Sequence, residues 1–203
     1  MVQVPLELMY TLDSVPQSFF QRFNKVDDEK DPGRCTVHCI LAAFLTLGSG
    51  DPEQGLCGPW GKSWPTRKDF EDTMPILWPQ SVRCLPGDRS VLPPSISGGW
   101  NTVLQLERLH DNNDDSHLLA QQERRLQRDW ERVLAVFPDT DWEAYSYNWL
   151  IVNTRCFFYL MPGDEPPEDP NDAMAMVPFA DYFNHSDEAV CILTFGPIYK
   201  AHC

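Results

Sequence analysis

The helical character of this chain is clearest in residues 118–160, which read LLAQQERRLQRDWERVLAVFPDTDWEAYSYNWLIVNTRCFFYL. Apolar side chains in the first half recur at three- and four-residue steps, the spacing of one face of a helix. This stripe consists of Leu119, Leu126, Trp130, Val133, Leu134 and Phe137. Charged residues between these positions, Asp129 among them, predict an opposite face in contact with solvent. We therefore predict a helix from Leu118 to Phe137, which ends at Pro138 because a proline ring cannot continue a helix.

A second predicted helix follows at once. Thr140 and Glu143 have the spacing of a capping box, in which each side chain accepts a hydrogen bond from the backbone of the other residue. Large apolar and aromatic residues then occupy most sides of this helix, so we expect it to be buried. They are Trp142, Tyr145, Tyr147, Trp149, Leu150 and Val152. The helix runs toward Arg155.

Arg155 stands between this aromatic helix and a further apolar run, residues 156–160. A guanidinium group in such surroundings needs a carboxylate partner, because it stays charged in proteins. Two interpretations remain open. Arg155 either forms an internal ion pair with Asp181 or Glu143, since buried charges are usually paired, or it holds the carboxylate of a ligand.

The N-terminal part of the chain carries weaker structural signals. Residues 2–9 are apolar and predict an edge strand or an extended segment, and residues 14–23 predict a short helix. Asp31 and Pro32 predict the start of a longer helix, with Asp31 as its N-cap and Pro32 at its first position. The apolar face of this helix comprises Val37, Ile40, Leu41, Phe44, Leu45 and Leu47. Gly48 is its predicted C-cap.

Residues 49–100 are rich in proline, glycine and tryptophan. Proline removes a backbone donor and biases the preceding residue away from the helix. This stretch therefore predicts packed, irregular loops rather than long elements. One short helix is expected over residues 66–74, since Thr66 and Asp69 flank its start. Farther along, the acidic and proline-rich residues 162–172 predict a surface loop.

Length and charge limit the classes of function. A chain of 203 residues suits one domain, or one core with an insertion. The net charge of −14 argues against nucleic-acid binding, which needs clustered lysine and arginine residues. Such a charge is explained by solubility alone, and attraction of a basic substrate is the functional alternative.

The cysteines predict buried thiols rather than a metal site. Seven cysteines form no CxxC pair, so buried reduced thiols explain them best. Cys35, His38 and Cys39 lie on one predicted helix, but a structural zinc site needs four ligands, and no second ligand pair is evident. The chain shows neither a signal-peptide pattern nor an apolar run long enough to cross a membrane. We therefore expect an intracellular protein.

Residues 178–186, Pro-Phe-Ala-Asp-Tyr-Phe-Asn-His-Ser, have the composition of a functional site. They connect two apolar segments, residues 174–177 and 190–195, which predict strands. Asn184 can both donate and accept hydrogen bonds, which suits the edge of an adenine ring or a peptide group. His185 can serve as a ligand, a base or a packed side chain. The alternative is an ordinary turn, stabilised by the side chains of Asp181 and Asn184.

Two segments together resemble the SET-domain protein lysine methyltransferases, in the branch of the Rubisco and ribosomal-protein methyltransferases. Residues 145–157, which include Asn153-Thr154-Arg155, are similar to the W…V…[ST]R.F stretch of that family. Residues 177–186 resemble the P.AD..NH motif of the branch, and the two segments occur in the expected order.

The resemblance implies a fold and a division of the chain. The fold is α+β and predominantly helical, with a partial SET-domain β core and a large helical insertion. Residues 1–30 would be the N-terminal remnant of the SET core, and residues 31–160 would be the helical insertion. Residues 161–203 would be the C-terminal remnant that carries the Asn-His motif.

The resemblance also implies roles for individual residues. Asn184 and His185 would hold the adenine end of S-adenosyl-L-methionine, and Arg155 would meet the carboxylate end of that cofactor. Asp181 would lie near the channel for the target lysine, where a carboxylate favours an ammonium group. The implied activity is S-adenosylmethionine-dependent methylation of a protein lysine, in the cytoplasm or the nucleus. The implied partner is a protein substrate, with no role for nucleic acid or membrane.

The sequence departs from the family pattern at both ends. No glycine-rich GxG strand lies upstream of Val4, and Tyr199 is too close to the Asn-His motif to match the catalytic tyrosine of the family. We therefore assign no catalytic residue and expect a truncated chain with impaired activity, so that its status as an enzyme stays open. The alternative is a non-catalytic interaction module derived from the insertion, which binds through the helix face around residues 124–128 or the aromatic loops of residues 58–100.

Overall fold

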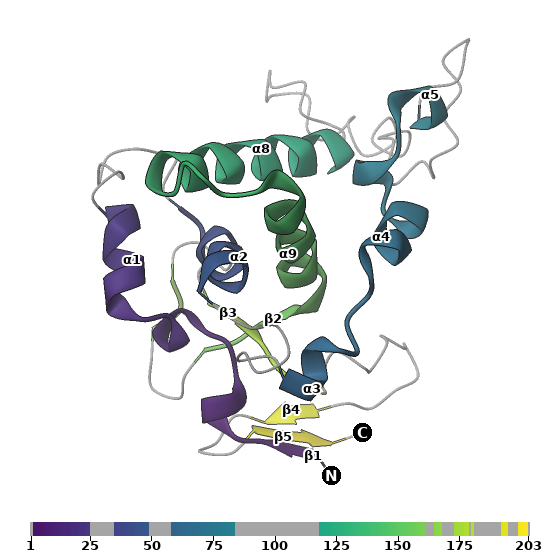
Figure 1. Ribbon diagram of the computed structural model, residues 1–203. Coiled ribbons are helices and arrows are strands. Elements are labelled where there is room, and N and C mark those ends of the chain that lie inside the picture. Colours follow the sequence, from purple (N-terminus) through teal and green to yellow (C-terminus); the bar gives the residue numbers. More distant parts are fainter. Residues whose placement is uncertain are drawn as a thin grey trace, which may run out of the picture. The chain divides into compact units, whose positions relative to one another are not determined.

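The computed structural model describes residues 2–24, 35–48, 58–83, 118–160, 165–167, 173–178, 180, 192–194 and 199–202 (Figure 1). The chain divides into two compact units. The first unit consists of Met1–Trp64 together with Asp129–Cys203, and the second unit is Pro65–Arg128.

The first unit is built on α2 (Val37–Leu47), which packs along α9 (Trp142–Arg155). Every residue of α2 from Val37 to Leu45 is buried, whereas Leu47 is 40% exposed. The predicted single apolar face is therefore too narrow a description, because α2 is covered on all sides over most of its length. Ala42, Ala43 and Cys39 are buried as well, although the apolar face predicted from the larger residues did not include them.

The two ends of α2 show one wrong and one confirmed prediction. The helix begins after Thr36, whose side chain accepts a hydrogen bond from the Cys39 backbone at 3.2 Å. The predicted start at Asp31 was wrong, although Asp31 and Pro32 themselves lie outside the described residues. Gly48 ends the helix as predicted, and its N–H donates to the Phe44 carbonyl at 2.8 Å. A Cβ atom at Gly48 would collide with the Phe44 ring, so glycine is required there for close approach.

The two predicted helices of residues 118–160 are present as α8 (Leu118–Val136) and α9. The predicted capping box at Thr140 and Glu143 was wrong by one residue. The N-cap of α9 is Asp141, whose carboxylate accepts a hydrogen bond from the Ala144 backbone at 2.8 Å. The Thr140 hydroxyl instead donates to the Phe137 carbonyl at 2.7 Å. The predicted burial of α9 is confirmed for Tyr145, Trp149, Leu150 and Val152, whereas Tyr147 is half-buried and Trp142 is 39% exposed.

Aromatic rings connect α1 (Gln17–Asn24), the short helix predicted over residues 14–23, with neighbouring elements. The Phe19 ring stacks on Phe137 with centroids 5.0 Å apart and meets Phe44 edge-on at 5.4 Å. The Arg22 guanidinium lies over the Phe137 ring, 3.9 Å from its centroid, and donates to the Val136 carbonyl at 3.1 Å. These contacts join α1 to the end of α8 and to α2.

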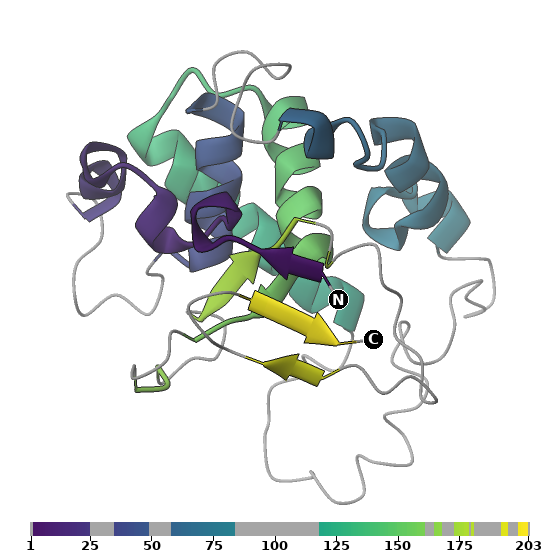
Figure 2. The ribbon, with the colours of Figure 1, turned by 90° about the horizontal axis from the view of Figure 1, so that it is seen from below.

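The strands form two small antiparallel sheets (Figure 2). One sheet has the order β1-β5-β4, from β1 (Val2–Val4), β5 (Tyr199–His202) and β4 (Ile192–Thr194). The edge position of β1 agrees with the prediction for residues 2–9, and Leu6–Leu8 form a 3-10 turn after it. The second sheet pairs β2 (Cys156–Phe158) with β3 (Met174–Met176). The strands predicted over residues 174–177 and 190–195 are thus both present.

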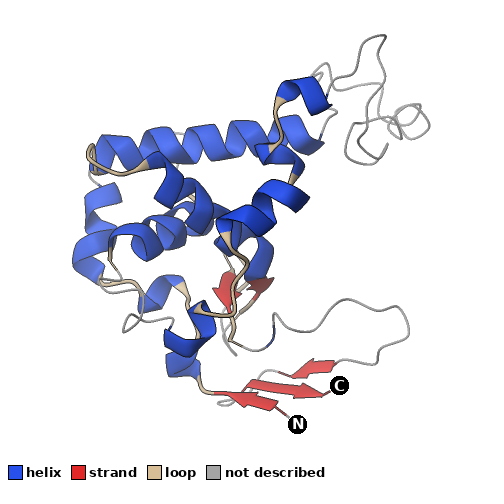
Figure 3. Ribbon diagram, turned by 45° about the vertical axis from the view of Figure 1, so that its right-hand side comes forward, coloured by secondary structure: helices blue, strands red, loops and turns tan. Residues whose placement is uncertain are grey.

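A small apolar cluster, here called the β core, lies where the N-terminal segment meets the second sheet. It consists of Val4, Met9, Tyr159, Ala175 and Val177. Tyr10 continues this sheet, because its N–H donates to the Met176 carbonyl and its carbonyl accepts from the Met176 N–H, both at 2.9 Å. Helices predominate over strands in the described part of the chain (Figure 3), in agreement with an α+β fold that is mostly helical.

Short helices occupy much of residues 58–83, the described part of the stretch for which we predicted packed loops. In the first unit, α3 (Gly58–Gly61) carries the buried Trp60, whose ring meets Trp64 edge-on at 5.1 Å. Trp60 also approaches the Tyr10 ring, with centroids 6.2 Å apart. The Trp60 ring therefore packs this proline-rich segment against the N-terminal segment of the same unit.

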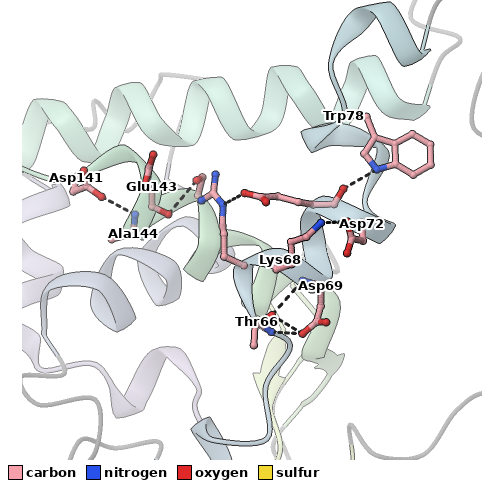
Figure 4. A network of polar contacts seen from close by, with 11 residues as sticks. Thr66, Lys68, Asp69, Asp72, Trp78, Asp141, Glu143 and Ala144 are labelled. Atoms are coloured by element: carbon pink, nitrogen blue, oxygen red, sulfur yellow. Dashed lines mark hydrogen bonds and ion pairs between the residues drawn. The ribbon is translucent and has the colours of Figure 1, made fainter.

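The second unit contains the helix predicted over residues 66–74, observed as α4 (Arg67–Thr73). Thr66 and Asp69 form a reciprocal capping box, with the Asp69 carboxylate 2.7 Å from the Thr66 backbone nitrogen (Figure 4). These hydrogen bonds lower the pKa of Asp69. A 3-10 turn (Pro75–Leu77) and α5 (Gln80–Arg83) follow. The Arg83 guanidinium forms an ion pair with Glu123 of α8.

Candidate functional site

Arg155 lies at the last position of α9, immediately before β2, and its side chain is half-buried. The two preceding side chains bond back to the helix. The Asn153 amide donates to the Trp149 carbonyl, and the Thr154 hydroxyl donates to the Leu150 carbonyl, each at 2.8 Å. Both are bonds to the carbonyl four residues earlier, which lies inside the backbone hydrogen-bond ladder of α9. That ladder continues to the C-cap, where the Cys156 N–H donates to the Val152 carbonyl. The helix thus passes into the strand with its last turn intact and Arg155 at the junction.

The pairing of β2 with β3 brings the two sequence motifs together. Cys156 stands opposite Met176 in this antiparallel register. Arg155 directly precedes Cys156, and Val177, the first residue of the Asn-His motif, directly follows Met176, so the two residues flank the same paired position. Val177 and Pro178 are buried, and the Ala180 N–H donates to the Val177 carbonyl at 3.2 Å. The start of the motif is therefore anchored beside Arg155.

The other predicted site residues lie outside the described part of the chain. Asp181, Asn184 and His185 are among them, so their roles and their relation to the Arg155 side chain stay predictions. One of the two ion-pair partners considered for Arg155 can be discarded. Glu143 occupies the first turn of the same helix, roughly 18 Å away at 1.5 Å per residue, and its side chain is exposed.

The guanidinium group of Arg155 is able to bind the carboxylate of a ligand. Its Nε atom is buried, and the side chain also has interactions within the fold. A guanidinium group presents several donors in a fixed plane, which matches two carboxylate oxygens at once. The donor chemistry is therefore compatible with the amino-acid end of S-adenosylmethionine.

A buried polar cluster in the helices of the first unit was missed by the sequence analysis. Asp129, predicted to face solvent, is only 1% exposed and accepts a hydrogen bond from the Trp149 indole nitrogen at 2.9 Å. The spacing could have revealed it, because Asp129 follows Leu126 by three residues and precedes Val133 by four, which places it on the apolar stripe. We assigned Asp129 to the solvent face because it is charged, although its position in the sequence places it on the apolar stripe.

The thiols of Cys35 and Cys39, whose sulfur atoms are 2.8 Å apart, and the phenol of Tyr145 complete this cluster. The Tyr145 hydroxyl donates to the Cys39 sulfur at 3.8 Å, and the Cys39 thiol lies 3.6 Å from the Asp129 carbonyl. Burial raises the pKa of Cys39 and of Tyr145 well above their ordinary values, so both side chains stay protonated at neutral pH. The described residues contain no group of three or more side chains that could hold a metal ion. The cluster is thus a set of buried hydrogen bonds between α2, α8 and α9.

Comparison with known proteins gives one informative similarity. The ribosomal lysine N-methyltransferase set11 of Schizosaccharomyces pombe is 28% identical to this chain over 130 residues. The matched stretch covers 63% of this chain but only 30% of that protein. No protein-family model matches the chain, and no solved structure matches it. The similarity is therefore to a part, about a third, of the length of that ribosomal lysine N-methyltransferase.

None of the helices that the structure describes combines the length and the apolar character needed to span a bilayer.

Proposed function

We propose that this chain carries part of the active site of a SET-type protein lysine N-methyltransferase, of the Rubisco and ribosomal-protein methyltransferase branch, that uses S-adenosylmethionine. The similarity to a ribosomal lysine methyltransferase supports the class of activity. The β2–β3 register carries the assignment of the site, because it anchors the start of the Asn-His motif beside Arg155. Two motifs separated in sequence would be expected to converge in this way if they bound one ligand.

In this proposal, Arg155 binds the carboxylate end of the cofactor, and Asn184 with His185 binds the adenine end. Asp181 lies near the entry of the target lysine and favours its approach as an ammonium group. S-adenosylmethionine, when bound, supplies a methyl group on a sulfonium centre. The contribution of the chain is to align this methyl group with a neutral lysine amine and to exclude water, since proximity and alignment account for much of the acceleration in such transfers.

Calorimetric titration of the chain with S-adenosylmethionine, extended to millimolar cofactor, tests this proposal. Hydrogen bonds to charged groups contribute about 1.5–3 kcal/mol each, so Arg155→Ala should weaken binding roughly 10- to 100-fold. Arg67→Ala is the matched control, because Arg67 lies on α4 and forms an exposed ion pair with Glu71 there. Equal binding by wild type and Arg155→Ala would contradict the assigned role, and no saturable binding by wild type would contradict the cofactor site itself.

Incorporation of a labelled methyl group into a ribosomal-protein mixture tests the reaction class. The proposal expects label on lysine side chains, which acid hydrolysis and amino-acid analysis would identify as methyl-lysines. Asn184→Ala should abolish the labelling, because its amide is assigned to the adenine ring. Cofactor binding without any transfer would instead favour a non-catalytic module.

A further inference from the structure

Two cysteines lie one helical turn apart at the N-terminal end of α2. Cys35 precedes the N-cap Thr36, and Cys39 lies in the first turn. Their sulfur atoms are 2.8 Å apart, and neither is in a disulfide. A disulfide bond is about 2.05 Å long, so the two sulfurs need to approach by only about 0.8 Å to form one.

The surroundings hold one member of this pair in place. Cys39 is fully buried, in contact with the Asp129 carbonyl of α8 and the Tyr145 hydroxyl of α9. Cys35 retains 6% of its surface and sits before the helix rather than within it. A small oxidant that enters from solvent would therefore meet Cys35 first. Cys39 is then in position to react with the oxidised Cys35, because its sulfur atom is held 2.8 Å from the Cys35 sulfur.

We propose that Cys35 and Cys39 form an oxidisable dithiol, which closes into a disulfide by reaction with a hydroperoxide. The Cys35 sulfur attacks one peroxide oxygen, the O–O bond breaks, and Cys35 becomes a sulfenic acid while water or an alcohol leaves. The Cys39 sulfur then attacks the Cys35 sulfur, the S–S bond forms and the S–O bond breaks. The departing hydroxyl takes the Cys39 proton and leaves as water. Two thiols are oxidised by two electrons in total, and one hydroperoxide is reduced.

The geometry favours a disulfide over a metal site at this pair. The carboxylate of Asp129 already accepts the Trp149 indole N–H at 2.9 Å. The described residues offer no third metal ligand beside the two sulfurs. Zinc would need four ligands, whereas a disulfide needs only the two atoms that are already in contact.

Oxidation of the intact chain by hydrogen peroxide, followed by unfolding, alkylation, digestion and tandem mass spectrometry, tests this inference. The expected product is a peptide lighter by two hydrogens, in which Cys35 and Cys39 are linked and unalkylated, and reduction should restore both alkylation sites. Fragmentation must place the link, because a tryptic peptide that begins at Cys35 also contains Cys57. Cys156, which is half-buried and outside the pair, serves as an internal control that stays alkylatable.

A variant separates pairing from general oxidation. In Cys35→Ser, Cys39 should remain a thiol under the same treatment and be alkylated after unfolding. The wild-type peptide map decides the question even if this variant folds poorly. Full alkylation of both cysteines in treated wild type would overturn the inference, as would a sulfinic or sulfonic acid at Cys35 without a link, or a link from either cysteine to a different one.

Discussion

The helical core and the β core of the first unit contain different kinds of buried side chain. The helical core, formed by the buried residues of α2, α9 and the Asp129–Val136 half of α8, includes a carboxylate, a phenol and two thiols among its apolar side chains. The β core contains five residues whose packed surfaces are apolar, and it joins segments from both ends of the sequence. Buried hydrogen bonds fix one arrangement of groups, whereas apolar packing tolerates substitution of similar volume. The helical core should therefore depend on individual atoms and the β core on volume.

Removal of the buried carboxylate should have the largest effect on stability. Asp129→Ala leaves the Trp149 indole N–H without its acceptor and opens a cavity, so we expect a loss of about 3 kcal/mol in the free energy of unfolding. Asp129→Asn retains an acceptor and should lose less. Denaturant unfolding measures both. Glu131→Ala, an exposed position on the same helix, is the control, and a loss at Asp129 as small as at Glu131 would refute the role of this hydrogen bond.

A valine-to-alanine substitution in each core compares how much buried apolar volume contributes to the stability of the two cores. Val177→Ala and Val152→Ala both remove two methyl groups from fully buried side chains. We expect about 2 kcal/mol of destabilisation for Val177→Ala, and somewhat less for Val152→Ala, because alanine favours the helix by roughly half a kcal/mol over valine. Denaturant unfolding again provides the measurement. A much smaller effect at Val177 would mean that the β core opens independently of the helices.

Alkaline pH should destabilise the helical core selectively through its phenol and thiol. Burial raises the pKa of Tyr145 above its ordinary value of 10.0, so the unfolded chain loses this proton first. The stabilisation is complete below pH 10 and is lost as pH rises toward the folded pKa, with a slope of about 1.4 kcal/mol per pH unit. Tyr145→Phe should remove this part of the slope in unfolding curves recorded above pH 10. An unchanged slope would contradict the burial of a neutral phenol.

The smallest expected effect concerns the cap of α9. Asp141→Ala removes the side chain that accepts the Ala144 N–H, which should cost about 1 kcal/mol. Glu143→Ala tests the alternative, since Glu143 was the partner in the capping box that the sequence predicted. Thermal unfolding of the two variants compares them, and a larger loss at Glu143 than at Asp141 would restore the original prediction.

Local signals predicted the helices well but only some of their ends. The apolar stripe of residues 118–137 and the Thr66–Asp69 capping box each act within a few residues, and α8 and α4 formed as expected. Where two residues able to cap a helix compete, as Thr140 and Asp141 do, the sequence alone does not choose between them. The choice depends on whether the Thr140 hydroxyl finds another acceptor, here the Phe137 carbonyl.

Strand pairing lay beyond what the sequence predicted. Neither β2 nor β5 was expected, because each is short and is held by a partner distant in the chain. Arg155 and residues 177–186 could be named as candidates from their chemistry and their resemblance to a family. The adjacency of Arg155 to the start of the second segment follows only from the register of Cys156 with Met176, which is a property of the folded chain.

The direct passage from α9 into β2 has a consequence for recognition. No loop separates the two elements, and α9 is packed along α2, so the backbone of Arg155 is fixed when the chain folds. A ligand that binds this guanidinium meets a preorganised partner and loses little affinity to the ordering of a flexible segment. Selectivity at this end of the site would then arise from rigid shape, so that an analogue with a displaced carboxylate is rejected rather than accommodated.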